Sequence, residues 1–176
     1  MSDNRIELLK SHIRDVPDFP KPGIVFKDIT PLLSAPEAFR TAVDLLVEHY
    51  RPMKLDTVVA VESRGFIFGS VLAHSLGLPL SIVRKPGKLP WKTHSVEYTL
   101  EYGTDKLEIH QDALEKGHRV AVIDDLLATG GTAAATAQLC SRLGAEVLDC
   151  GFVIELSFLG GREKISPTRC FSLISY

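Results

Sequence analysis

The segment that most constrains the fold of this 176-residue chain runs from Val120 to Thr132. Four apolar residues precede two adjacent carboxylates, Asp124 and Asp125, and a loop of small residues then leads into an alanine-rich stretch. A buried strand, a glycine-rich turn and a helix in this order are typical of a parallel α/β sheet, which binds ligands at the carboxyl ends of its strands. The segment therefore predicts two acids and a set of free backbone amides at that edge.

The loop after the acids has the composition of a phosphate site. Gly130 and Gly131 allow a ligand to approach the backbone closely. Thr129 and Thr132 add hydroxyl groups. Carboxylates beside a phosphate indicate a ligand that also carries hydroxyl groups, so a sugar phosphate fits best. The structural alternative is a strand end with a capping Asp and a glycine-rich turn.

Composition and missing motifs exclude several classes. The formal net charge of −2 provides no basic field for nucleic acid. No apolar stretch is long enough for a membrane span, and the N-terminal residues lack the apolar core of a signal peptide, so we expect no membrane partner and a cytoplasmic location. The three cysteines are widely spaced and fit buried free thiols. Neither the Walker loop nor the Rossmann glycine motif is present.

Apolar periodicity predicts strands that alternate with helices along one domain. Strands are expected at 57–61, 80–83, 119–123, 147–154 and 170–174, and helices at 5–16, 66–76, 132–143 and after a capping box at Ser34–Glu37. Residues 93–109 alternate on both sides of a glycine turn and predict an inserted β-hairpin. Gly160–Lys164 is interpreted as a structural turn with a charged surface.

Two more predicted strand ends carry anion-binding chemistry. Glu62–Gly65 opens a helix, which predicts a second amide cradle with a fixed cation at Arg64. After the next strand, Arg84, Lys85 and Lys88 place three cations within five residues, which favours anion binding. The structural alternatives are a helix cap by Ser63 and a solvated basic turn.

The Val120–Thr132 segment closely resembles the phosphoribosyl diphosphate (PRPP) motif of type I phosphoribosyltransferases. Gly23–Pro31 and Leu100–Gly103 resemble stretches of the adenine-specific members, and the resemblance covers about residues 5–176 in the same motif order. It implies a type I phosphoribosyltransferase fold, with a central, mostly parallel sheet between helices, a β-hairpin flap at about 91–108 and a small base-binding hood at about 1–34. Together these would form a single domain over residues 1–176.

The resemblance also implies an activity. Adenine and PRPP would give AMP and pyrophosphate by an oxocarbenium-like displacement at ribose C1, a purine salvage step. Mg²⁺ would enter with PRPP, with no metal held mainly by the protein. The expected partners are these small molecules and a second copy of the chain in a homodimer.

The same resemblance assigns roles to individual residues. The PRPP ribose and 5′-phosphate fall to Asp124, Asp125, Ala128, Thr129, Gly130, Gly131 and Thr132. Pyrophosphate falls to Glu62, Ser63, Arg64, Gly65, Lys85 and Arg84, with a non-proline cis peptide at or beside Glu62–Ser63. Adenine falls to Val25, Phe26 and Lys27, where the Phe26 ring offers a stacking face or is a plain core aromatic. Glu101 would be the catalytic acid or base, and Tyr102 would help the flap close.

Three other interpretations compete with this one. A phosphoribosyltransferase for another purine base would share the PRPP motif but not the joint presence of Val25–Asp28 and Leu100–Gly103. A non-catalytic PRPP-sensing regulator usually carries an added DNA-binding domain or a basic face. A structural protein would leave Asp124 and Asp125 unexplained. Lys27 and Pro86 depart from the usual family pattern, which concerns base preference and flap kinetics rather than reaction class.

Overall fold

The computed structural model describes residues 4–99 and 104–176, and the chain divides into two compact units, Met1–Leu45 and Leu46–Tyr176. The first unit contains α1 (Asn4–Ser11), β1 (Arg14–Pro17), β2 (Val25–Asp28), α2 (Thr30–Ser34) and most of α3 (Pro36–Tyr50). The single-domain organisation, with its hood and flap, remains a prediction.

The prediction of one helix over residues 5–16 is wrong beyond Ser11. Residues 14–17 instead form β1, which pairs antiparallel with β2. Arg14–Asp28 and Lys27–Asp15 add cross-strand ion pairs of 2.9 and 2.6 Å. The local apolar spacing could not reveal these strand partners, which lie 14 and 12 residues away in the sequence.

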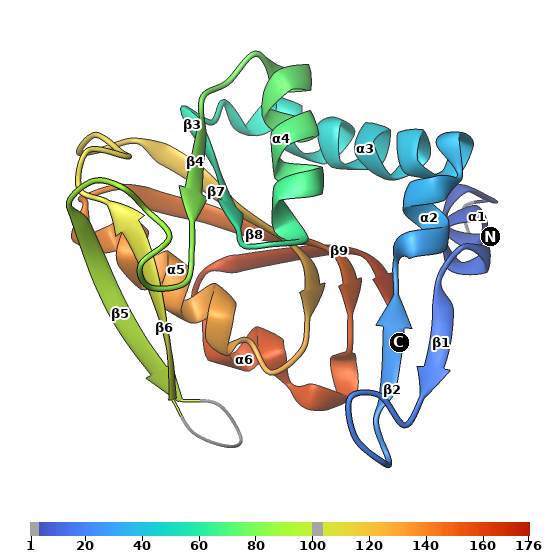
Figure 1. Ribbon diagram of the computed structural model, residues 1–176. Coiled ribbons are helices and arrows are strands. Elements are labelled where there is room, and N and C mark those ends of the chain that lie inside the picture. Colours follow the sequence, from blue (N-terminus) through green and yellow to red (C-terminus); the bar gives the residue numbers. More distant parts are fainter. Residues whose placement is uncertain (1–3, 100–103) are drawn as a thin grey trace. The chain divides into compact units, whose positions relative to one another are not determined.

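The second unit is built on a five-stranded parallel sheet in the order β4-β3-β7-β8-β9 (Figure 1). Its strands are β3 (Thr57–Val61), β4 (Leu80–Val83), β7 (Arg119–Leu127), β8 (Glu146–Glu155) and β9 (Arg169–Ser175). The connecting helices are η1 (Arg51–Met53), α4 (Gly65–Leu76), α5 (Gly131–Arg142), η2 (Ser157–Leu159) and α6 (Gly161–Ile165). The predicted parallel α/β sheet is confirmed, and 57–61 and 80–83 are the strands expected.

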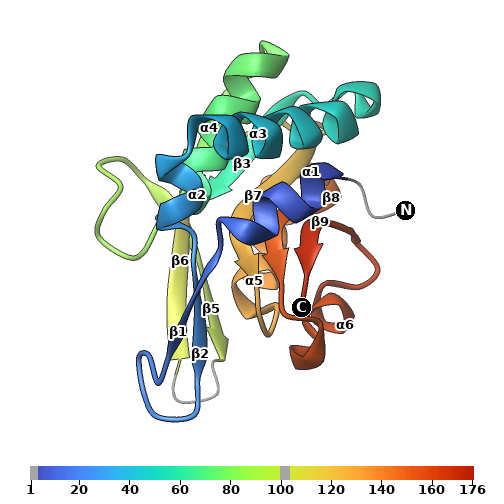
Figure 2. The same ribbon diagram turned by 90° about the vertical axis from the view of Figure 1, so that its right-hand side faces the viewer.

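Helices cover both faces of this sheet because its strands are apolar on both sides (Figure 1). On one face Ala60 lies so close to Gly69 of α4 that a Cβ on the glycine would overlap the alanine side chain. On the other face Val59 and Val122 pack in one buried cluster with Leu139 of α5. α5 lies beside α6 on this second face (Figure 2).

The inserted hairpin consists of β5 (Thr93–Thr99) and β6 (Thr104–His110), which pair antiparallel. Val96, Leu107 and Ile109 belong to the same buried cluster as residues of α5, so one face of the hairpin packs against α5 within the second unit. The predicted hairpin is confirmed.

In the part of the chain that the structure describes, no helix is long and apolar enough to cross a membrane.

β7 is longer than predicted. The apolar run suggested an end at Ile123, but pairing with β8 continues to Leu127, where Leu127 lies opposite Glu155. The neighbouring β3 pairs with β7 only as far as Ile123. Asp124 and Asp125 therefore lie within the last part of β7, beyond its pairing with β3, at the carboxyl edge of the sheet as expected.

Candidate active site

A cavity of about 500 Å³ opens where β3 and β7 end. It is lined by residues 62–64 after β3, by residues 124–133 from the end of β7 into α5, and by Lys85, Tyr98, Asp105, Leu107 and Phe152. The structure thus brings most of the predicted PRPP residues to one place. Gly65 and Arg84, also predicted for pyrophosphate, do not line it.

The two adjacent acids of β7 have different partners. Asp125 is only 4% exposed and accepts a hydrogen bond from Arg64 Nε. Asp124 Oδ1 accepts one from the backbone N–H of Asp125 at 2.8 Å. Burial and the neighbouring Asp125 carboxylate raise the pKa of Asp124 well above its usual range. Both residues line the cavity, and carboxylates at this position can accept hydrogen bonds from the hydroxyl groups of a ligand.

Residues 128–132 form a glycine-rich loop that leads into α5 and lines the cavity. Gly130 has φ of +79° and caps the helix, so the first amides of α5 have no helical partner. The first turn of α5 carries no acidic residue, and Thr132 adds its hydroxyl to the cavity lining. This arrangement suits a phosphate group.

The α6 segment packs against this loop, a contact that the sequence did not predict. A Cβ on Gly130 would collide with the carbonyl oxygen of Gly161, and a Cβ on Gly161 would collide with the carbonyl oxygen of Ala128. Two glycines thus allow α6 to lie directly against the loop of residues 128–130.

Arg162 anchors α6 to the end of the sheet. Its guanidinium donates two hydrogen bonds of 2.6 Å to Glu155, which is 5% exposed, and another of 2.8 Å to the carbonyl of Cys170. The hydrogen bonds from Arg162 outweigh burial and lower the pKa of Glu155. The interpretation of Gly160–Lys164 as a turn is corrected, because the segment leads into the short helix α6; its charged side chains are exposed as expected, and Arg162 also binds the buried carboxylate of Glu155.

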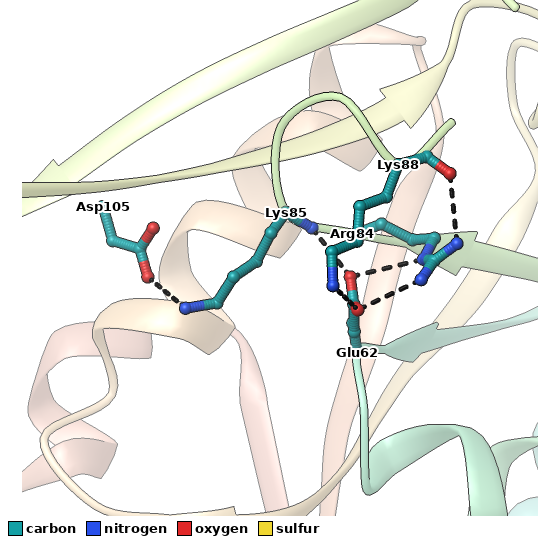
Figure 3. Close-up of polar contacts among 5 residues, drawn as sticks. All are labelled: Glu62, Arg84, Lys85, Lys88 and Asp105. Atoms are coloured by element: carbon teal, nitrogen blue, oxygen red, sulfur yellow. Dashed lines mark hydrogen bonds and ion pairs between the residues drawn. The ribbon is translucent and has the colours of Figure 1, made fainter. Parts of the chain in front are cut away.

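Glu62 organises the basic loop after β4 (Figure 3). Its carboxylate accepts hydrogen bonds of 3.0–3.3 Å from Arg84, from the backbone N–H of Lys85 and from Lys88. Burial alone would raise the pKa of Glu62, but these hydrogen bonds outweigh burial and lower the pKa to about 2. The predicted cis peptide between Glu62 and Ser63 is present. The carboxylate thus fixes the loop that presents Lys85 to the cavity.

Tyr98 and Asp105 line the cavity but were not singled out from the sequence. Lys85 Nζ lies 3.1 Å from Asp105 Oδ2, and the Tyr98 hydroxyl lies 3.3 Å from the Thr132 hydroxyl. Strand alternation could have found them, since Tyr98 follows the inward-facing Val96 by two residues and Asp105 precedes Leu107 by two.

The residues predicted for the base lie in the first unit, on β2. Phe26 packs edge-on against Phe19, with ring centroids 5.2 Å apart, and Val25 is 49% exposed. Lys27 Nζ lies 2.6 Å from Asp15. Glu101 and Tyr102, on which the catalytic and flap predictions rest, lie outside the described residues. The roles of these residues remain predictions.

The cavity offers oxygen ligands but no complete metal cage. Across residues 4–99 and 104–176, no group of three or more His, Cys, Asp or Glu side chains could hold a metal ion. Asp124 and Asp125 supply two carboxylates, and Mg²⁺ is commonly bound by one or two carboxylates together with substrate phosphates. The donor set fits an ion that arrives with a diphosphate.

Known proteins show strong similarity to the chain. The family model of the phosphoribosyl transferase domain matches residues 28–175. The adenine phosphoribosyltransferase of Syntrophotalea carbinolica is 56% identical over 171 residues, which cover 97% of this chain and 100% of that protein. That of Acaryochloris marina is 58% identical over 168 residues, covering 96% and 99%. The crystal structure of adenine phosphoribosyltransferase from Thermoanaerobacter pseudethanolicus superposes with a TM-score of 0.95 at 51% identity, covering 97% and 99%.

Proposed function

The chain belongs to the phosphoribosyl transferase family, and on this premise we propose that it is an enzyme that transfers the phosphoribosyl group of PRPP to adenine, giving AMP and pyrophosphate. The observation that carries the proposal is a single cavity in which an acid pair, a glycine-rich helix start and a lysine lie together. Relatives named for this reaction, aligned over nearly the whole chain, support adenine as the acceptor.

In the proposed mechanism, the protein holds PRPP by its three polar parts. Asp124 and Asp125 accept hydrogen bonds from the ribose hydroxyls. The amides and hydroxyls of residues 129–132 hold the 5′-phosphate. Ser63, Arg64 and Lys85 hold the pyrophosphate, and the positive charges of Arg64 and Lys85 stabilise it as the bond to ribose C1 breaks. The bond from C1 to the purine nitrogen forms on the opposite side of an oxocarbenium-like state, without a covalent enzyme intermediate, and Glu101 is the residue proposed to take the proton that this nitrogen loses.

Mg²⁺ belongs to the proposal as an ion that enters with PRPP, and when bound it would neutralise the diphosphate oxygens. Asp124 and Asp125 are the residues that would contact it or its waters. The base site at Val25, Phe26 and Lys27 is equally part of the proposal. So are the homodimer and the cytoplasmic location.

The first test supplies PRPP and Mg²⁺ with adenine, hypoxanthine, guanine or xanthine in parallel assays, and scores both nucleotide and pyrophosphate. AMP formed from adenine alone is the expected result. Turnover of another base would keep the PRPP site but overturn the base assignment to Phe26. PRPP binding without any turnover would favour the regulator instead.

Glu101→Ala is expected to lower turnover by about a hundredfold or more while leaving PRPP affinity nearly unchanged. The reason is that general acid–base catalysis typically contributes factors of 10²–10⁴, whereas the PRPP contacts lie on other segments. Initial rates and calorimetric PRPP binding measure the two quantities separately. Glu97→Ala is the matched control, because Glu97 is a nearby acid paired 3.2 Å from Lys106 on the outer hairpin surface. Equal losses of turnover and affinity in the Glu101 variant would contradict the role.

A further inference from the structure

Lys85, the cation proposed for pyrophosphate, is already paired with a carboxylate in this structure. Its Nζ lies 3.1 Å from Asp105 Oδ2, and both residues line the cavity (Figure 3). Lys85 follows β4, whereas Asp105 is the second residue of β6 on the hairpin. The contact therefore joins two separate elements across the proposed diphosphate position.

The Asp105 carboxylate is held in place by more than the lysine. Oδ1 accepts a hydrogen bond of 2.8 Å from the backbone N–H of Lys106, and Oδ2 accepts one of 3.4 Å from the Tyr98 hydroxyl. The same tyrosine hydroxyl reaches Thr132 in the phosphate loop at 3.3 Å. Burial alone would raise the pKa of Asp105, but the hydrogen bond from Lys85 helps to lower it, so the group is an anion at neutral pH.

A fixed anion at this position opposes the ligand proposed for the cavity. Pyrophosphate must take Lys85 as a partner, and it carries the same sign of charge as the carboxylate that now holds Lys85. Like charges a few ångströms apart in a partly buried site repel strongly. The Asp105 carboxylate thus pairs with Lys85 as an oxygen of the proposed diphosphate would.

We propose that Asp105 is a placeholder for the diphosphate, which keeps Lys85 oriented while the site is free and is displaced from it when PRPP or pyrophosphate binds. This inference rests on the proposed function. It assigns Asp105 a positioning role that limits affinity for the diphosphate. After the reaction, Asp105 competes with the released pyrophosphate for Lys85. An exchange of this kind weakens ground-state binding and favours product release.

The placeholder and a merely structural role predict opposite signs for one substitution. Asp105→Asn keeps the shape of the side chain and an oxygen acceptor for Lys106 and Tyr98, but it removes the charge. Without a competing anion, pyrophosphate and PRPP should bind roughly three- to tenfold more tightly, as expected for one partly exposed charge pair. A structural role would instead weaken binding.

The experiment is calorimetric titration of inorganic pyrophosphate, and then of PRPP, into the wild type, Asp105→Asn and Glu97→Gln, each with and without Mg²⁺. Glu97→Gln is the matched control, because it makes the same change of charge on the same hairpin at a residue that does not line the cavity. Asp105→Glu should restore affinity close to that of the wild type. Asp105→Ser gives the same sign of change if the asparagine variant is unstable.

Tighter binding in Asp105→Asn with unchanged binding in Glu97→Gln supports the placeholder. Unchanged or weaker binding overturns it, and weakening that occurs only with Mg²⁺ would make Asp105 part of the ion's environment instead. A wild type that binds neither pyrophosphate nor PRPP would overturn the proposed function itself. The two failures are therefore distinguishable.

Discussion

Gly130→Ala should abolish measurable PRPP turnover and lower the melting temperature by about 4–20 °C. Gly130 has φ of +79°, where a side chain costs roughly 1–2 kcal/mol. The new Cβ would also collide with the carbonyl oxygen of Gly161, a backbone atom that α6 holds in place. Overpacking of this kind costs about 1–3 kcal/mol, and each kcal/mol corresponds to about 2–4 °C in a chain of this size. Relief of the collision would displace the phosphate loop, so PRPP affinity should fall more than a hundredfold.

Gly117→Ala separates the conformational cost from the collision. Gly117 has φ of +85°, but nothing lies within 4 Å of the position that its Cβ would take. This variant should lose only about 2–8 °C and keep its PRPP affinity. Thermal melts and calorimetric titration with PRPP measure both quantities. Equal affinity in the two variants would mean that contact with α6 does not position the loop.

The local motifs could be predicted from the sequence because their information lies within one short segment. An apolar run, two acids and a glycine pair predicted the β7–α5 unit, and the helix began within one residue of the expected position. Strands β3 and β4 were predicted correctly because short apolar runs between turn residues indicate buried strands. The edge of a parallel sheet then brings 62–64 and 124–132 together without further information.

Features that depend on distant partners were missed. Arg162 in a charged stretch gave no sign that buried Glu155 would bind it, because that pairing exists only after β8 and α6 are placed. Strand alternation could have placed Asp105 on the inward face of the hairpin, but its contact with Lys85 depends on how β6 lies beside the loop after β4. The length of β7 was missed for the same reason, because pairing with β8 rather than local apolarity extends the strand past Ile123.

Asp124→Asn should raise stability while lowering catalytic efficiency. Burial and the Asp125 carboxylate raise the pKa of Asp124, so at neutral pH its charge costs the folded state free energy. Asparagine removes that charge and keeps an oxygen for the Asp125 amide, so the melting temperature should rise. The loss of charge-assisted hydrogen bonds to the ribose hydroxyls should lower kcat/KM by about ten- to a hundredfold.

The difference in melting temperature between Asp124→Asn and the wild type should depend on pH. A raised pKa means that the stability contributed by Asp124 is fully present below the ordinary range of aspartate and is lost as pH rises through the raised value. The asparagine variant does not titrate there, so its advantage in melting temperature should be present near pH 8 and vanish as pH falls below about 4.

Asp125→Asn is the matched comparison, since it removes one charge from the adjacent residue. Asp125 is the carboxylate that binds Arg64, so its loss should lower the melting temperature while impairing catalysis to a similar degree. Two neighbouring acids with the same proposed ligand would then affect stability with opposite signs. A lower melting temperature in both variants would mean that the charge of Asp124 does not destabilise the protein without ligand. The hydrogen bond from the Asp125 backbone N–H to Asp124 would then stabilise the fold.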